Sequence, residues 1–263
     1  MDLRLSGKTA LVTGGSQGIG RAIACQLASE GVKVAIAARD EVRVRATAAE
    51  LSAKTGGHVI GFSADMGRER DVAGLVERAR SALGPISILV NNAATPAGRV
   101  RPPALADITR DKLIAEIDVK VLGYLFAAQA VAPAMIDAGW GRIINIAGLA
   151  ARSTGSAIGS IRNVAVAALT KNLADELGPN GINVTCLHPG LTRTRSLDEA
   201  ADEGERARLA SVEERIRSGN SIRAMIDADD IAVIVAFLAS PLSVAINGDS
   251  VACGGGAPGS IHY

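Results

Sequence analysis

The sequence predicts an α/β fold in which helices cover both faces of a parallel sheet, forming a three-layer sandwich. Two observations indicate this class. Seven short apolar runs alternate along the chain with longer segments of helical periodicity. Several of these runs are continuously apolar, which is typical of strands that are buried on both faces. Because no linker, composition break or repeat interrupts the order, we expect residues 1–263 to form a single domain.

Each predicted element depends on a local pattern. The first helix carries Ile23 and Leu27 at helical spacing and ends at Gly31. Gly-Pro pairs follow the third and fifth helices, and Asp227 is the expected N-cap of the last helix. The predicted strands are, in order, 9–12, 32–37, 59–62, 86–90, 142–146, 182–187 and 249–252. The predicted helices are, in order, 18–30, 41–54, 68–83, 111–138, 158–177, 195–217 and 227–239.

One segment differs in character from the rest. Residues 195–220 are rich in charge and have a poor apolar stripe. Two readings stay open for this segment, a mobile lid and a solvated surface helix.

Composition and charge exclude several functional classes. Hydrophobic residues make up 48% of the chain and charged residues 21%, which excludes a disordered protein. A net charge of +1 and 2% aromatic residues give no case for binding nucleic acid or an anionic membrane. Three cysteines, Cys25, Cys186 and Cys253, have no metal-like spacing and are expected to be buried in a reducing compartment. The charged N-terminus does not resemble a signal peptide, and the apolar runs fall short of a membrane span, so we expect a soluble, cytoplasmic protein without a metal site.

A glycine-rich turn follows the first strand and opens the first helix. It runs from Thr13 to Gly20 and reads Thr-Gly-Gly-Ser-Gln-Gly-Ile-Gly. Glycine permits a tight turn, lets backbone N–H groups approach a phosphate and allows close packing of helix on sheet. The helix N-terminus offers further N–H groups and the positive end of its dipole. The strand–turn–helix context therefore predicts a dinucleotide site.

Several motifs together resemble the short-chain dehydrogenase/reductase family over nearly the whole chain. They are the opening through Gly20, the Asn-Asn-Ala-Ala segment from Asn91, the strand around residue 144, and the Pro-Gly-x-x-x-Thr segment from Pro189. The resemblance implies a Rossmann-like, doubly wound sheet of about seven strands, and hydride transfer between a nicotinamide and a carbonyl or alcohol. The cofactor-binding residues it implies are Gly14, Ser16, Gln17, Gly18, Ile19, Gly20, Arg39, Asp65, Asn91, Ala93, Pro189, Gly190, Thr192 and Thr194.

The end of the second strand decides the choice between NAD and NADP. The acidic position of NAD-dependent family members falls on Ala38, and Arg39 follows it. An arginine there pairs with a 2′-phosphate, so we expect NADP to be preferred over NAD. Two features oppose this expectation, because Asp40 comes next and Gln17 stands where NADP enzymes often have a basic residue.

The family's catalytic Asn, Ser, Tyr and Lys do not align with matching residues in this chain. The Tyr and Lys must lie one helical turn apart, so that both reach the cofactor. The four positions fall on Lys120, Gly148, Gly159 and Asn163 in one register. In the other register the Ser, Tyr and Lys positions fall on Ala147, Ile161 and Ala165. The two tyrosines, Tyr124 and Tyr263, begin no Tyr-x-x-x-Lys motif.

Four replacements for the missing groups are open. Lys120 either takes part in catalysis or fills the vacated space and bonds loop carbonyls. Tyr124 is expected in the core, and Tyr263, at the end of a glycine-rich tail, is a candidate to reach an active site of its own or of a neighbouring chain. The serine-rich loop is a further source of hydroxyls, although a hydroxyl without an activating base is a poor acid. Its members are Ser153, Thr154, Ser156 and Ser160.

Three functions follow from these observations. The first is an NADP-binding oxidoreductase with a non-standard active site. The second is a nucleotide-binding pseudoenzyme or partner subunit, and the third is a non-redox lyase or isomerase. None of these motifs specifies the substrate.

The family pairs through the helices at 111–138 and 158–177, so we expect a homodimer or homotetramer.

Overall fold

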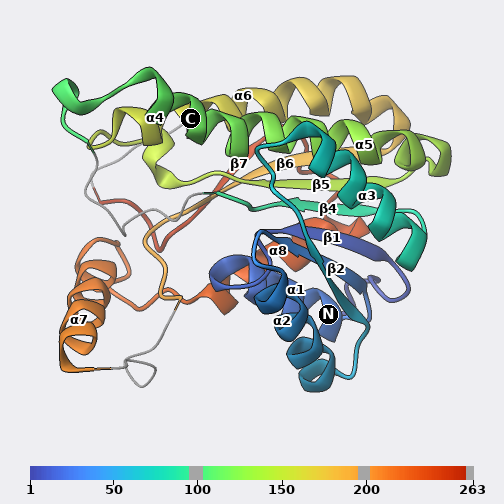
Figure 1. Ribbon diagram of the computed structural model, residues 1–263, viewed down its shortest axis with the longest axis horizontal. Helices are drawn as coiled ribbons and strands as arrows, with labels where there is room; N and C mark the ends of the chain where they lie inside the picture. Colours follow the sequence, from blue (N-terminus) through green and yellow to red (C-terminus); the bar gives the residue numbers. More distant parts are fainter. Residues whose placement is uncertain (95–102, 195–201, 259–263) are drawn as a thin grey trace.

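Seven strands form one parallel sheet, which confirms the predicted fold class (Figure 1). The computed structural model describes residues 1–94, 103–194 and 202–258. The strand order is β3-β2-β1-β4-β5-β6-β7, so the order reverses between β1 and β4. In sheets of this kind ligands bind beyond the carboxyl ends of the strands, at that reversal. The strands are β1 (Thr9–Thr13), β2 (Lys33–Ala38), β3 (Val59–Ser63), β4 (Ile88–Asn91), β5 (Gly141–Ile146), β6 (Ile182–Pro189) and β7 (Ser250–Cys253).

Helices cover both faces of the sheet (Figure 1). α1, α2 and α8 pack on one face, and α3, α5 and α6 pack on the other. The helices are α1 (Gly18–Ser29), α2 (Glu41–Thr55), α3 (Glu69–Leu83), α4 (Arg110–Ile117), α5 (Gly123–Ala138), α6 (Ala157–Leu177), α7 (Glu203–Ser218) and α8 (Ala228–Ala239).

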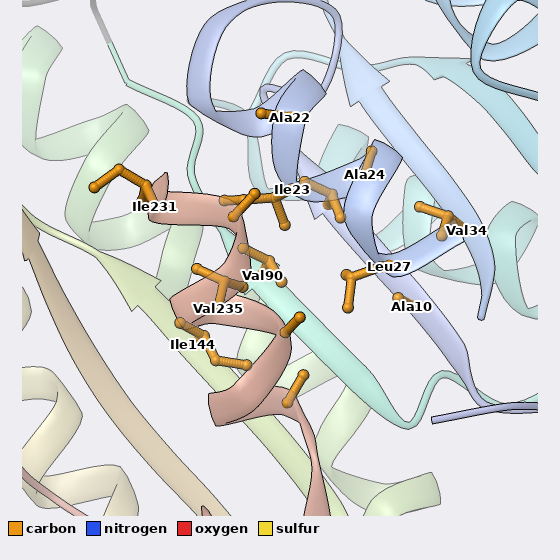
Figure 2. Packing of buried hydrophobic residues seen from close by; sticks show 14 of the residues in the cluster. Ala10, Ala22, Ile23, Ala24, Leu27, Val34, Val90, Ile144, Ile231 and Val235 are labelled. Carbon is orange, nitrogen blue, oxygen red and sulfur yellow. The ribbon is translucent and has the colours of Figure 1, made fainter. Parts of the chain in front are cut away.

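The continuous apolar strands supply both cores at once. Ala10 and Val12 of β1 belong to the core beneath α1 and α8, whereas Leu11 belongs to the core on the opposite face. Figure 2 shows side chains of this first core, with Leu27 of α1 and Val235 of α8 among them. Successive side chains of a strand point to opposite faces, so a strand buried on both faces is apolar at consecutive positions.

The predicted helix 111–138 is interrupted. α4 ends at Ile117, a π-helical turn spans Asp118–Leu122, and α5 begins at Gly123. Such a turn inserts an extra residue into a helix and is often found at functional sites. Lys120, the most buried side chain of this turn, lies at its centre.

Three further expectations need correction. The helical segment Arg110–Ala138 has 29 residues and a mean hydropathy of 1.5 in its most apolar window, so it has the length and composition of a membrane span after all. It packs on the sheet through Ala127 and Val131. Cys25 is only half-buried, whereas Cys186 and Cys253 are buried. α7 begins at Glu203, well after residue 195, and residues 195–201 lie outside the described part of the chain.

Candidate functional site

The glycine-rich turn forms a cradle that only glycine fits. Gly14 has φ 67° and Gly18 has φ 56°, a region that favours glycine. A Cβ on Gly20 would overlap the Gly14 carbonyl oxygen and the Asn92 amide, and a Cβ on Gly15 would lie 2.7 Å from Ile36 Cβ. α1 therefore starts directly against the turn. The side chain of its cap residue Gln17 makes no capping hydrogen bond to the first turn, so it leaves the helix N-terminus free for an anion.

Two residues that were not singled out as binding residues hold this cradle to the sheet. Asn92 Nδ2 donates to the Thr13 carbonyl at 3.0 Å and to the Gly14 carbonyl at 3.2 Å. The Thr13 hydroxyl accepts from the backbone N–H groups of Asn92 and Ala93, at 3.0 and 3.1 Å. The ends of β1 and β4 are therefore bonded to each other at the point where the strand order reverses. The Asn-Asn motif was the sequence signal for this contact.

The end of β2 presents two arginines. The Asp40 carboxylate is the N-cap of α2, where it accepts from Arg43 N at 2.9 Å. Arg39 is exposed beside it. Arg43 Nη1 lies 3.5 Å from Gln17 Oε1, which places a second guanidinium at the glycine turn. Sequence reasoning missed Arg43 because no local pattern shows that the first turn of α2 lies next to residue 17.

Two further residues expected at the cofactor, Asp65 and Asn91, differ in their contacts. Asp65 Oδ1 accepts from Gly67 N at 3.1 Å, and its carboxylate lies 3.6 Å from Arg68. Asn91 is fully buried and points into the sheet, where its Nδ2 donates to Asn145 Oδ1 at 2.9 Å. Asn91 therefore braces β4 against β5, and Asn92 faces the turn.

The segment after β6 returns to the glycine turn. Pro189 ends the strand, and Gly190 packs so closely on Gly254 that a Cβ there would lie 3.0 Å from its Cα. The Thr192 hydroxyl donates to the Gly190 carbonyl at 3.1 Å. The Thr194 methyl group lies 3.4 Å from where a Cβ on Gly18 would be. Residues 18 and 194, far apart in sequence, thus border one site.

The positions expected for Ser, Tyr and Lys lie just after β5 and in the first turns of α6. Gly148 follows β5, and a Cβ on it would lie 3.4 Å from Asn163 Nδ2. Gly159 lies in the first turn of α6, where its N–H bonds to the Ser156 hydroxyl at 3.0 Å. A Cβ on Gly159 would lie 2.8 Å from that hydroxyl. The start of α6 is therefore built around a glycine, and a larger residue would have to displace its N-cap.

Lys120 reaches the same region from the π-helical turn. The side chain is buried, and Nζ donates to the Ala147 carbonyl at 2.7 Å. Burial lowers the pKa of Lys120 to about 8. Of the two readings of this residue, the contact with a loop carbonyl is the one that the structure contains. The lowered pKa also leaves a group that can exchange a proton near neutral pH.

The neighbouring polar groups are mostly committed to the core. Tyr124 is buried and donates to the Ile146 carbonyl at 3.0 Å, as expected for a core tyrosine. His188 lies 2.9 Å from the Gly148 carbonyl and 3.4 Å from Cys186 Sγ. Burial lowers the pKa of His188 and raises that of Cys186 to about 11, so the thiol stays protonated. Ser153 and Ser160 bond carbonyls of their own loop, and Tyr263 lies outside the described residues.

A comparison with protein families decides the assignment. The family described as short chain dehydrogenase matches residues 8–205. The chain belongs to the short-chain dehydrogenase family. The dehydrogenase/reductase SDR family member 4 of Oryctolagus cuniculus is 35% identical over 261 residues, which are 98% of this chain and 96% of that protein. The NADPH-dependent reductase BacG of Bacillus subtilis is 30% identical, over 98% of this chain and 100% of that protein.

Solved structures of short-chain dehydrogenases agree with this fold. The L-sorbose reductase of Gluconobacter frateurii, complexed with NADPH and L-sorbose, matches with a TM-score of 0.89 and 28% sequence identity. The match covers 99% of this chain and 100% of that chain. The chain therefore shares the fold of these structures, with a Rossmann-like, doubly wound sheet.

The residues of the turn fit a dinucleotide. The cradle has no room for a Cβ at Gly15 or Gly20, and the side chain of Gln17 leaves the N-terminus of α1 free. The Arg43 guanidinium stands at its outer edge, and Arg39 is exposed after the end of β2. This set supplies backbone N–H groups for a pyrophosphate and cations for a further phosphate.

Proposed function

We propose that the chain is an NADP(H)-dependent oxidoreductase that transfers hydride between a nicotinamide and a carbonyl or alcohol, with a non-standard proton-transfer site. The observation that carries the proposal is the glycine cradle, in which Gly20 packs against the Gly14 carbonyl and leaves the start of α1 open. The nicotinamide, when bound, supplies or accepts the hydride. The chain's own residues bind the dinucleotide, orient the substrate and move the proton.

The end of β2 supports NADP over NAD. Asp40 is occupied as the N-cap of α2 and pairs at 3.7 Å with Arg43, so its carboxylate is engaged within the protein. Arg39 and Arg43 provide guanidinium groups that pair with a 2′-phosphate. A related reductase and a related structure carry NADPH in their names, which points in the same direction.

Binding titrations test the cofactor preference. We expect wild-type protein to bind NADPH more tightly than NADH. Arg43→Gln should weaken NADPH binding about 10–150-fold, because a charge-assisted hydrogen bond contributes about 1.5–3 kcal/mol, and should leave NADH binding unchanged. Arg45→Gln on the same helix is the matched control, since Arg45 pairs with Glu41. Equal affinities for the two nucleotides in wild-type protein would refute the preference.

The proton-transfer groups are the non-standard part of the proposal. Gly148, Gly159 and Asn163 stand at the positions of the family's Ser, Tyr and Lys, and Lys120 stands at the position of its Asn. Lys120 is our candidate proton carrier, because its ammonium lies beside the Gly148 peptide and titrates near pH 8. Removing general acid–base help slows a reaction about 10²–10⁴-fold. We therefore expect NADPH oxidation by ketones and aldehydes to be slow.

The second candidate function is a pseudoenzyme that binds nucleotide without turnover. Residue 159 is a glycine and supplies no tyrosine hydroxyl as a general acid, which favours this second function. NADPH oxidation across a panel of carbonyl compounds separates the two functions. Turnover above the protein-free rate that Lys120→Ala abolishes, with NADPH affinity unchanged, supports the enzyme and its proton carrier. If Lys120→Ala leaves the turnover unchanged, the proton comes instead from the loop 153–160, the C-terminal tail or water. If the wild-type protein shows no turnover, the result favours the pseudoenzyme.

We also propose assembly through the outer face of α6. Ile161 and Val164 are about half exposed there, and Ala168 lies one turn further on. Burying such a face drives association of helices. Light scattering should give a homodimer or homotetramer at micromolar concentration, and a monomer would refute the assembly.

A cytoplasmic location and a lid at 195–220 remain predictions, to be checked by cell fractionation and by limited proteolysis with and without NADPH.

A further inference from the structure

Helix α4 carries no buried residue, so the burial of apolar side chains contributes little to its position. Among the residues that the structure describes, its one polar contact with α6 is an ion pair in which Arg162 Nη1 donates to the Glu116 carboxylate. The Arg162 and Glu116 side chains are 9% and 21% exposed, so water hardly reaches the pair. A buried charge is strongly unfavourable without its partner. The ion pair therefore ties α4 to the body of the protein.

The π-helical turn Asp118–Leu122 begins two residues after Glu116. Beyond the turn, α5 is fixed by its packing on the sheet and by Gly123, where a Cβ would overlap the Met66 carbonyl oxygen. The extra residue of such a turn is lost only if one flanking helix rotates, by about 100° for one residue. Since α5 is fixed, α4 is the helix that would have to rotate. The ion pair opposes this rotation, because it would carry Glu116 away from Arg162.

The place of the Lys120 side chain depends on this turn. Its described hydrogen bond runs from Nζ to the Ala147 carbonyl at 2.7 Å, and no described carboxylate pairs with it. The titratable neighbours that act on it are Cys186 and His188, and burial keeps the Cys186 thiol protonated by raising its pKa to about 11. Burial disfavours an ammonium, and one carbonyl contact offsets only part of this. If the turn were no longer held, Lys120 would therefore move to water.

We propose that Arg162 is a positioning residue, which through its ion pair with Glu116 maintains the π-helical turn and so holds the Lys120 ammonium on the Ala147 carbonyl. Arg162 contacts α4 and therefore acts through Lys120. The positioning is argued from these contacts alone, whereas the role of Lys120 as proton carrier rests on the proposed function.

The titration of Lys120 tests this positioning. Protein labelled with ¹³C at the lysine Cε atoms is followed by NMR from pH 7 to pH 9, and Lys120→Met assigns the Lys120 signal. The wild-type signal should titrate near pH 8, since burial lowers the pKa of Lys120 to about that value. In Glu116→Gln the pKa of Lys120 should return toward 10.5, because the ammonium reaches water, and its signal should stay at the protonated position up to pH 9.

The direction of this change separates positioning from two other effects. Loss of the Glu116 charge by itself would lower the pKa of Lys120, because a nearby anion stabilises an ammonium. A loss of stability by itself would leave the pKa of Lys120 where it is. Asp111→Asn is the matched control, because Asp111 is exposed in the first turn of α4 and the substitution removes the same charge. Its Lys120 signal should titrate as in wild type.

A second variant covers the case in which Glu116→Gln does not fold, since that substitution leaves a buried guanidinium unpaired. Glu116→Ala/Arg162→Met removes both charges together and keeps the net charge, and it should raise the pKa of Lys120 in the same way. A Lys120 pKa that stays near 8 or falls in either folded variant overturns the proposal. Wild-type Lys120 that does not titrate below pH 9, or failure of both variants to fold while Asp111→Asn folds, overturns it as well.

Kinetics with NADPH connect the positioning to the proposed function. If Lys120 carries the proton, Glu116→Gln should lower kcat for carbonyl reduction by about 10²–10⁴-fold and leave the Kd for NADPH unchanged. An unchanged kcat together with a raised Lys120 pKa refutes the proton carrier and supports the positioning. Wild-type protein that binds no NADPH, or binds it without turnover, refutes the proposed enzyme, and the NMR titration still decides the role of Arg162.

Discussion

The buried lysine of the π-helical turn should make the stability of the protein depend on pH in a defined way. Lys120 is buried with its ammonium on the Ala147 carbonyl, and burial lowers its pKa from 10.5 to about 8. Lys120→Met removes the titrating group and keeps an unbranched apolar side chain. The measurement is the free energy of unfolding of both proteins, by urea denaturation between pH 7 and pH 9.

The sign and size of the effect follow from proton binding. The unfolded lysine keeps its proton up to about pH 10.5, whereas the folded lysine loses it near pH 8. Between these values the unfolded state binds more protons, so the stability of the wild-type protein rises with pH. Where the unfolded state binds one proton more than the folded state, the free energy of unfolding rises by about 1.36 kcal/mol for each pH unit. From pH 7 to pH 9 the wild-type protein should gain about 1.4 kcal/mol relative to Lys120→Met.

A second substitution separates this effect from a change of net charge. Lys112 is exposed and donates to the Asp107 carbonyl at 2.7 Å, so Lys112→Met removes a comparable hydrogen bond at the surface. The gap between wild type and Lys112→Met should stay constant over the range. Burial raises the pKa of Cys186 to about 11, and the range stops at pH 9 to limit its contribution. A gap between wild type and Lys120→Met that is flat from pH 7 to pH 9 would refute the reasoning.

Three further predictions concern the site and its supports. Gly20→Ala should abolish NADPH binding in calorimetry, since its methyl group would overlap the Gly14 carbonyl; unchanged affinity would contradict the cradle. Asn145→Leu should lower the free energy of unfolding by about 1–3 kcal/mol, because Asn91 loses its partner in the sheet, and a loss within 0.5 kcal/mol would count against this brace. Asp227→Ala removes the capping box of α8 and an ion pair, so the Tm should fall, by an amount equivalent to about 1–2 kcal/mol; an unchanged Tm would show that neither contact matters.

The strands and most helices could be read from the sequence because their signals are local. The continuous apolar run at β1 predicted a strand buried on both faces, and its residues do divide between two cores. Asp227 was expected to cap α8 and takes part in a full capping box. The π-helical turn at Asp118–Leu122 was not predicted, because a pattern of apolar residues does not reveal one inserted residue.

The sequence by itself determined the parallel sheet and the glycine turn, since these depend on the order of residues along the chain. Only the tertiary structure decided what those residues touch. It placed Arg43 at Gln17, bonded Lys120 to the Ala147 carbonyl, and brought the Asn163 side chain next to Gly148. Each of these facts joins elements that are distant in sequence, and such contacts are set by packing across the sheet rather than by any local pattern.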